Sequence, residues 1–219
     1  MNPKILLAAA ILIITDLAGA QSLYDPSRLQ EIRIYFAFSD WDARLDSLKK
    51  ANPDGRLIAG YALLNGQRFD SVGIRYKGNS TYSATRNKNP FNIKLDFVKG
   101  SQQYDGFNTL KLSNAFMDPS FLREALGYQI CRQYLPAPRA NFMMVFVYVA
   151  YVGLYTNVEN ISKDFLSRNF ASSDNAFFQC DRTDVQQTLP SSCTGNPGSA
   201  LKYTSADSAC YYNSYEKES

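Results

Sequence analysis

The chain of 219 residues contains no histidine. This absence excludes Ser-His-Asp and Cys-His catalysis, histidine-ligated zinc and histidine general bases, because each of them needs an imidazole. Any chemistry must therefore run on carboxylates, lysines, arginines and main-chain donors. An excess of one charge is also absent, since 23 Lys and Arg against 20 Asp and Glu leave a formal charge of +3. Without a long basic run, nothing indicates a nucleic-acid partner or a polybasic membrane patch.

Long apolar runs are scarce, and the longest lies at the N-terminus. Lys4 precedes an apolar run over residues 5–14, and Ala18-Gly19-Ala20 then supplies small residues at a cleavage point. This order is typical of a signal peptide over residues 1–20, which predicts a secreted or cell-surface protein of residues 21–219. An uncleaved anchor is the alternative, although the run is short for a membrane span. No second apolar stretch is long enough to span a bilayer.

Cysteine is limited to four residues, and three of them lie in a tail rich in Ser, Thr and Gly. An exported chain permits disulfides, so we expect one bridge among the three late cysteines Cys180, Cys193 and Cys210, most simply Cys180 with Cys193. The fourth, Cys131, lies in a helical pattern and is predicted to be a small buried hydrophobe.

The stretch 118–138 (DPSFLREALGYQICRQYLPAP) predicts a central helix of about four turns. Asp118 can cap the first turn, Pro119 suits the first helical position, and Pro136 ends the run. Apolar residues occupy most sides of this helix, which indicates that it is covered on more than one face. A lone carboxylate is expensive to bury there, so Glu124 should have a cationic partner or a hydrogen-bond network.

The remaining pattern predicts an α+β protein with antiparallel strands before and after the central helix. Asn65-Gly66 is a favoured two-residue hairpin turn between two strand-like runs. The expected strands are 31–38, 57–64, 67–76, 90–97, 109–112, 141–149 and 151–158. Further helices are expected from a cap at residue 39 or 40 to the turn at 52–55 (NPDG), and over 162–170.

A polar loop over residues 75–81 follows the hairpin and is rich in small residues. Lys88 and Lys94 lie just before and within the next strand, so the loop can close over an anionic group. The alternative is a surface loop with solvated lysines. Glu159 ends an apolar strand and is most simply a solvated charge at the strand end.

Five stretches together resemble the CotH kinase family, an atypical protein-kinase-like family first associated with spore coats and also found in secreted proteins. The stretches are 72–80 (VGIRYKGNS), 88–94 (KNPFNIK), 118–124 (DPSFLRE), 136–139 (PAPR) and 153–159 (GLYTNVE). Their order and spacing cover nearly all of the chain after residue 20. No single stretch would suffice.

The resemblance implies a protein-kinase-like fold, with an antiparallel sheet lobe packed on a central helix that holds ATP with Mg or Mn. It also implies phosphoryl transfer to Ser or Thr of a protein substrate, such as a surface or coat protein. The loop at Lys77, Asn79 and Ser80 would cover the phosphates. Lys94, or alternatively Lys88, would meet the α/β-phosphates, with Glu124 orienting that lysine. The strand ending at Glu159 would lead to the adenine-contacting segment.

Two departures from the family pattern are visible in the sequence. The family holds its metal with two Asp-containing motifs in the C-terminal half, and the sequence stops at Ser219 before such motifs occur. We therefore expect an incomplete C-terminal lobe: an ATP-binding half, without catalytic residues, that does not phosphorylate protein alone. The second departure is Tyr148-Val149-Ala150, which stands where the family usually has an Asn-Gly turn.

Other functions stay open at this stage. With 15 Tyr and 14 Phe, the chain can instead be a non-catalytic cell-surface module that presents aromatic side chains to carbohydrate or envelope proteins, although scattered aromatics more often form a core. A hydrolase built on the acid pairs Asp40/Asp42 or Asp181/Asp184 is less favoured, because both lie in ordinary capping or loop contexts. Asn79 and Asn160 begin N-glycosylation sequons.

Overall fold

The computed structural model describes residues 22–174, 177–180, 188–193, 203 and 205–217. The predicted signal peptide and the acids Asp181 and Asp184 lie outside the described residues. Two compact units follow one another along the chain, Met1–Ile161 and Ser162–Ser219. Each unit is described by itself.

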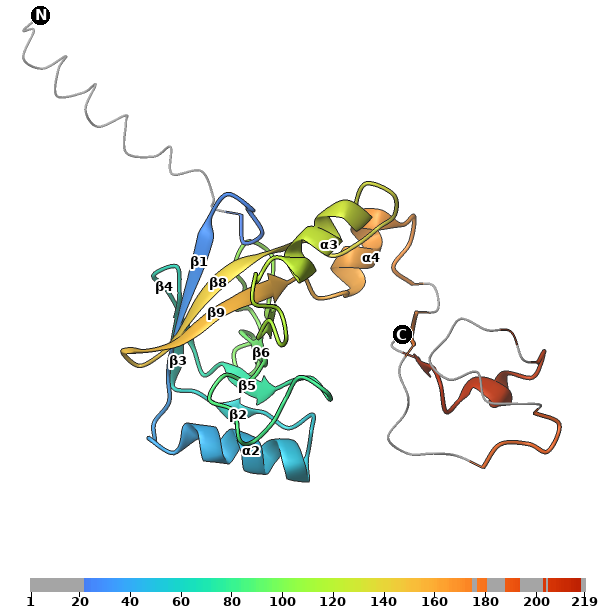
Figure 1. The fold of residues 1–219 in the computed structure, drawn as a ribbon, viewed down its shortest axis with the longest axis horizontal. Helices are drawn as coiled ribbons and strands as arrows, with labels where there is room; N and C mark the ends of the chain where they lie inside the picture. The colour runs from blue at the N-terminus through green and yellow to red at the C-terminus, as the bar shows by residue number, and fades with distance from the viewer. Residues whose placement is uncertain (1–21, 175–176, 181–187, 194–202, 204, 218–219) are drawn as a thin grey trace, which may run out of the picture. The chain divides into compact units, whose positions relative to one another are not determined.

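The first unit is an α+β structure in which one sheet dominates (Figure 1). In its described part, residues 22–161, two helices accompany the strands: α2 (Trp41–Ala51) and α3 (Arg123–Cys131). The strands are β1 (Leu29–Tyr35), β2 (Leu57–Ile58), β3 (Tyr61–Leu64), β4 (Gln67–Asp70), β5 (Gly73–Tyr76), β6 (Phe91–Lys94), β7 (Thr109–Ser113), β8 (Ala140–Val147) and β9 (Ala150–Val158).

The strand order is β2-β5-β6-β7-β9-β8-β1-β3-β4. Every neighbouring pair is antiparallel except β1 and β8, which pair in parallel. The expectation of a purely antiparallel sheet is therefore wrong at this one pair. The sheet is mixed because β8 pairs with the side of β1 that β3 leaves free, after eight intervening elements that allow the chain to return in the same direction.

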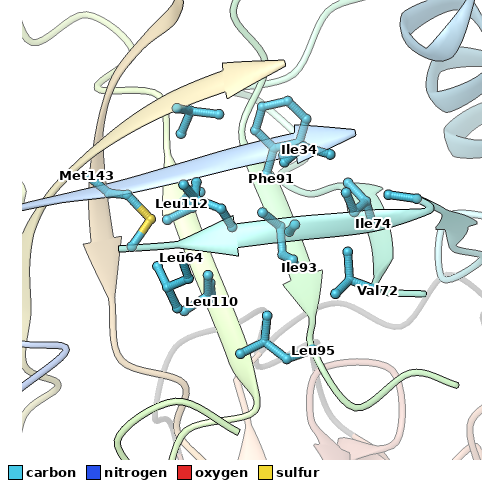
Figure 2. Close-up of a cluster of buried hydrophobic side chains, with 14 of the residues drawn as sticks. Ile34, Leu64, Val72, Ile74, Phe91, Ile93, Leu95, Leu110, Leu112 and Met143 are labelled. Atoms are coloured by element: carbon cyan, nitrogen blue, oxygen red, sulfur yellow. The ribbon is translucent and has the colours of Figure 1, made fainter. Parts of the chain in front are cut away.

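The core lies inside the curl of this sheet (Figure 2). Alternate residues of the strands point inward, so Ile34 and Leu64 from one part of the sheet meet Ile74, Ile93 and Leu110 from another, all of them fully buried. Burial of each such side chain contributes roughly 1.5–3 kcal/mol to folding. The apolar faces of the two parts of the sheet thus cover one another.

Helix α2 closes onto the same core through Leu45, whose side chain is buried. Two tyrosines attach α2 to β5 and to the segment that follows it: the hydroxyl of Tyr76, at the end of β5, donates to Asp42, and that of Tyr82 donates to Asp46 over 2.8 Å. Burial and the neighbouring carboxylates raise the pKa of both tyrosines, to about 12 for Tyr82. Both hydroxyls therefore remain protonated donors at neutral pH.

Helix α3 differs from its sequence-based prediction in length and in burial. It spans nine residues, Arg123–Cys131, and none of them is buried. Asp118 does not begin the helix directly; its carboxylate accepts hydrogen bonds from the backbone N–H groups of Ser120 and Arg123. Because the sheet buries its own apolar face, the helix is peripheral and not central. Large apolar side chains at one side of it are half exposed, namely Leu122, Leu126 and Ile130.

The hairpin between β8 and β9 turns without Asn-Gly because tertiary contacts hold the turn. Tyr148 takes the positive φ of 54° that such a turn requires. The backbone N–H of Tyr148 donates to the Ile34 carbonyl over 2.8 Å, and its hydroxyl donates to the Phe38 carbonyl over 2.6 Å. The bonds to β1 and its following loop replace the local preference of glycine.

The second unit contains α4 (Lys163–Asn169), the two-residue strands β10 (Phe178–Gln179) and β11 (Glu216–Lys217), and a 3₁₀ turn, Ser208–Tyr211. A disulfide joins Cys193 to Cys210. A bridge among the late cysteines is therefore confirmed, but the predicted pairing of Cys180 with Cys193 is wrong. Cys180 and Cys131 are both free and exposed, so Cys131 is not the buried residue that its sequence context suggested. In the described part of the chain, no helix has the length and apolar character to span a bilayer.

Candidate phosphate-binding pocket

A chain of three polar side chains connects β5, β7 and α3. Lys77 directly follows β5, where its backbone N–H still pairs with the carbonyl of Pro90. Its ammonium donates to the Ser113 hydroxyl over 3.0 Å, and that hydroxyl donates to Glu124 Oε1 over 3.1 Å. The cationic partner that the sequence demanded for Glu124 is therefore Lys77, reached through a serine.

The surroundings of Lys77 and Glu124 disfavour the charged form of each side chain. Desolvation lowers the pKa of Lys77, and the charge of Glu124 opposes that effect only in part. Desolvation likewise raises the pKa of Glu124, against the opposing effects of Lys77 and of the Ser113 hydrogen bond. Ionisable groups with perturbed pKa values that face one another are more frequent at functional sites than elsewhere.

The three residues line a pocket of about 530 Å³. Its walls offer two cations, two carboxylates and several small polar groups beside an apolar rim. The lining residues are Lys77, Thr81, Ser113, Asn114, Ala115, Phe116, Met117, Asp118, Arg123 and Glu124. A pocket of this volume is in the range of small-molecule sites.

The wall between β7 and α3 has an unusual backbone. Ala115, Met117 and Phe121 have φ values of 51°, 57° and 60°, although none of them is glycine. Such left-handed residues cost of order 1–3 kcal/mol each and are kept only where their surroundings hold them. One such constraint is Asn114, whose amide donates to the carbonyls of Thr81 and Lys88 and so ties this wall to the loop after β5.

Lys94 does not lie beside Glu124, and that predicted pairing is wrong. The register pairs Lys94 with Thr109, at the opposite end of β7 from Ser113, which is roughly 13 Å away at 3.3 Å per residue. Its ammonium instead lies 3.9 Å from Asp96.

The register of three strands explains why Lys77 takes this place. Tyr76, Phe91 and Leu112 are successive partners across β5, β6 and β7. Lys77 follows Tyr76 and Ser113 follows Leu112, so the two residues lie at the same end of β5 and β7. The sequence alone does not give the register between strands, and so it could not predict that Lys77 and Ser113 meet.

Lys88 lies against aromatic rings. Its ammonium is 4.7 Å from the ring centre of Phe121 and 4.9 Å from that of Tyr155. Gly153 leaves room for the lysine stem, because a Cβ at that position would come within 2.9 Å of Lys88 Cε. Desolvation lowers the pKa of Lys88. The stretches 88–94 and 153–159 are thus linked by direct packing.

The other predicted residues occupy different surroundings. Asn79 and Ser80 are exposed on the loop that follows Lys77. Glu159 is buried, and its two carboxylate oxygens accept from Nε, Nη2 and the backbone N–H of Arg139 at 3.0–3.2 Å. The expectation of a solvated charge at Glu159 is therefore wrong. The end of β9 is buried, and Arg139, directly before the neighbouring strand β8, pairs with the Glu159 carboxylate.

Comparison with known protein families matches residues 74–218 to the family described as CotH kinase protein. The match covers more than half of the chain. The protein belongs to the CotH kinase family. The matched region begins within β5 and contains every residue that lines the pocket. No curated protein matches the chain. Family membership suggests a kinase-like function for this CotH-family chain.

Proposed function

We propose that the pocket beside Lys77 binds the phosphates of ATP. The observation that carries this proposal is the hydrogen-bonded chain from Lys77 through Ser113 to Glu124 in the pocket wall. Protein kinases use a strand lysine, oriented by a helix glutamate, to hold the α/β-phosphates. The loop at Asn79 and Ser80 would lie over the phosphates, and β5, β6, β7 and α3 would form the corresponding part of a kinase-like lobe.

The pocket residues suit this ligand. Lys77 and Arg123 supply positive charge, and Thr81, Ser113 and Asn114 supply polar contacts. A magnesium ion that accompanies phosphates commonly takes one or two protein carboxylates and fills its other positions with phosphate oxygens and water. Asp118 and Glu124 are the carboxylates that line this pocket and would be its protein ligands. Such an ion would neutralise charge on the phosphates. Among the described residues, no group of three acids, cysteines or histidines could hold a metal without such a ligand.

We further propose that this polypeptide alone binds nucleotide without transferring phosphate to protein. Transfer needs carboxylates that hold the metal and orient the acceptor hydroxyl. Asp118 and Glu124 would hold the metal, and both also accept hydrogen bonds within the fold, from the backbone at the start of α3 and from Ser113. Neither carboxylate is then left to orient the acceptor hydroxyl. Glu124 thus orients Lys77 and does not act as a base. A Ser- or Thr-containing surface protein remains the proposed acceptor of the family activity, and residues 1–20 are proposed to export the chain to the secreted or surface fraction.

Thermal melting of the chain with MgATP, with Mg²⁺ alone and with neither tests nucleotide binding. A ligand that binds only the native state at 100 times its Kd stabilises it by about 2.7 kcal/mol. We expect this stabilisation in the wild type and in Lys94→Gln, which removes a lysine of the same sheet outside the pocket. Lys77→Gln should lose it. Equal stabilisation of both lysine variants would contradict the proposed site.

Labelled ATP with Ser-rich acceptor peptides tests the absence of transfer. We expect the wild type and Glu124→Ala to incorporate the same background amount of phosphate. Incorporation by the wild type above the Glu124→Ala level would show that the pocket carboxylates suffice for transfer and would overturn this part of the proposal.

A further inference from the structure

Two irregular segments supply walls of the pocket. Residues 77–90 connect β5 to β6 and contribute Lys77 and Thr81, whereas residues 114–122 connect β7 to α3 and contribute residues 114–118. Neither segment contains helix or strand, and among these described residues no backbone hydrogen bond joins one segment to the other. Beyond the strand ends that anchor them, the two walls are therefore held together by side chains.

Asn114 is the most deeply buried of the side chains that link the two segments. It is 8% exposed, and its amide nitrogen donates to the carbonyls of Thr81 over 3.1 Å and of Lys88 over 3.0 Å. One side chain thus holds the segment 77–90 at two points. Since hydrogen bonds are directional, this contact fixes the orientation of the segment as well as its distance from the other wall.

Two further contacts join the same segments but are less specific. The guanidinium of Arg86 lies 4.1 Å from the ring centre of Phe116, and the ammonium of Lys88 lies 4.7 Å from that of Phe121. The Phe116 side chain is partly exposed, and a cation above an exposed ring is held weakly and within a broad range of positions. Asn114 is therefore the contact that sets the geometry between the walls.

The position of Asn114 in the chain connects this contact to the ligand-binding groups. Ser113, directly before it, joins Lys77 to Glu124. Ala115, directly after it, is the first residue with positive φ in this wall, a backbone conformation that persists only where its surroundings hold it. The contacts of Asn114 thus determine where the polar chain and the strained wall lie relative to the segment 77–90.

We propose that Asn114 is the positioning residue of the pocket, which holds the segments 77–90 and 114–122 as one unit around a bound nucleotide. The inference rests on the proposed function, since it assigns Asn114 a role in that binding. A preorganised pocket binds more tightly because less conformational freedom is lost when the ligand enters. Without the Asn114 amide, the two segments move independently, and a ligand must order each of them separately.

Hydrogen–deuterium exchange of the full chain, free and with MgATP, tests this role together with the MgATP affinity measured by calorimetry. In the wild type, MgATP should slow exchange in both segments. Asn114→Ala should weaken MgATP binding by roughly 10-fold, because the walls are no longer preorganised. In the free variant, exchange should become faster in both segments and stay unchanged in β8 and β9, since only local opening becomes easier. Asn114→Ser keeps one donor, should have an intermediate affinity, and provides the test if Asn114→Ala does not fold.

Asn141→Ala is the matched control, because Asn141 makes the same kind of hydrogen bond outside the pocket. Its amide nitrogen donates to the carbonyls of Leu23 and Asp25, and its oxygen accepts from Asn157. Because it removes three hydrogen bonds in a fully buried place, this variant should lose at least as much stability as Asn114→Ala. Its MgATP affinity should nevertheless stay within about twofold of the wild type, as expected for independent sites.

The outcomes separate this inference from the proposed function. No MgATP binding by the wild type overturns both. Wild-type binding that Asn114→Ala retains in full overturns the role of Asn114 alone, as does an equal loss of affinity in Asn141→Ala, which would reflect stability only. Faster exchange confined to one segment of free Asn114→Ala would show that the amide does not couple the walls and would also overturn it. Weaker binding with faster exchange in both segments, set against an unaffected Asn141→Ala pocket, supports it.

Discussion

Glu159 and Glu124 both meet a basic side chain near the end of a strand, but the two regions satisfy these carboxylates differently. Glu159 has a side chain only 1% exposed and binds Arg139 directly through both of its oxygens. Arg139 also lies over the rings of Tyr24 and Phe107. Glu124 meets Lys77 only through the Ser113 hydroxyl, at the wall of an open pocket.

This difference separates a pair that stabilises the fold from one that can take part in binding. A direct two-oxygen pair uses the arginine fork and leaves the carboxylate fully engaged. An ammonium has three donors, and Ser113 takes one of those of Lys77. The ammonium of Lys77 is desolvated and has donors that Ser113 does not use, so a ligand oxygen can accept from it.

The largest expected effect comes from breaking the direct pair. Arg139→Met should lower the free energy of unfolding by about 3–5 kcal/mol, because it leaves a buried carboxylate without its cation. Denaturant unfolding followed by circular dichroism measures this. A cost below about 1 kcal/mol would mean that Glu159 finds another partner and that the two regions do not differ as argued.

A double-variant cycle on the indirect pair should give a smaller loss. Lys77→Met alone leaves Glu124 desolvated, and we expect a cost of roughly 1–2 kcal/mol. Adding Glu124→Gln should restore most of the lost free energy of unfolding, since burial disfavours the charged forms of both Lys77 and Glu124. Both variants should lose stabilisation by MgATP. A double variant less stable than either single one would show that the pair stabilises the fold and would weaken the comparison.

The local features of the fold were predictable because short-range rules govern them. Strand alternation located β1, β8 and β9 to within a few residues. The Asn65-Gly66 turn is confirmed, and its two positive φ values, 49° and 85°, are those of the expected hairpin turn. The demand of Glu124 for a basic partner was also correct, since it follows from the cost of an unpaired, desolvated carboxylate.

What the sequence could not supply depends on contacts between distant segments. The parallel pairing of β1 with β8 is one such contact. The register across β5, β6 and β7 is another, and it brings Lys77, not Lys94, to the end of β7 where Ser113 meets Glu124. Local periodicity carries no register between strands. The exposure of α3 was missed for a related reason: its apolar pattern predicts burial, but the curled sheet has already covered the core.

The pH dependence of stability distinguishes Glu124, whose carboxyl is desolvated, from Asp70 and Asp118, whose carboxylates accept stabilising hydrogen bonds. The folded pKa of Glu124 is raised by desolvation, so its contribution to stability is full below its unfolded pKa of 4.5 and is lost as pH rises through the folded value. The pKa values of Asp70 and Asp118 are lowered, chiefly by hydrogen bonds from Lys99 and Ser120. Their contributions are present above the unfolded value of 3.8 and are lost as pH falls.

Glu124→Gln should therefore gain stability relative to the wild type as pH rises from about 4 toward 7, an effect smaller than that of the double cycle. The difference in Tm between the two proteins, measured at each pH, reports it directly. Asp70→Asn serves as the control and should show the opposite slope in the acid range. A pH-independent difference for Glu124→Gln would mean that its carboxyl has the same pKa in the folded and unfolded chains.

The smallest effect is expected at Lys94, and it defines the boundary of the functional region. The Lys94 side chain is 42% exposed, and its distance of 3.9 Å from Asp96 is long for an ion pair, so Lys94→Gln should change the free energy of unfolding by less than about 0.5 kcal/mol. Stabilisation by MgATP should match that of the wild type, because Lys94 does not line the pocket. A loss of MgATP stabilisation with unchanged stability of the free protein would place Lys94 in the nucleotide site and remove it as a control.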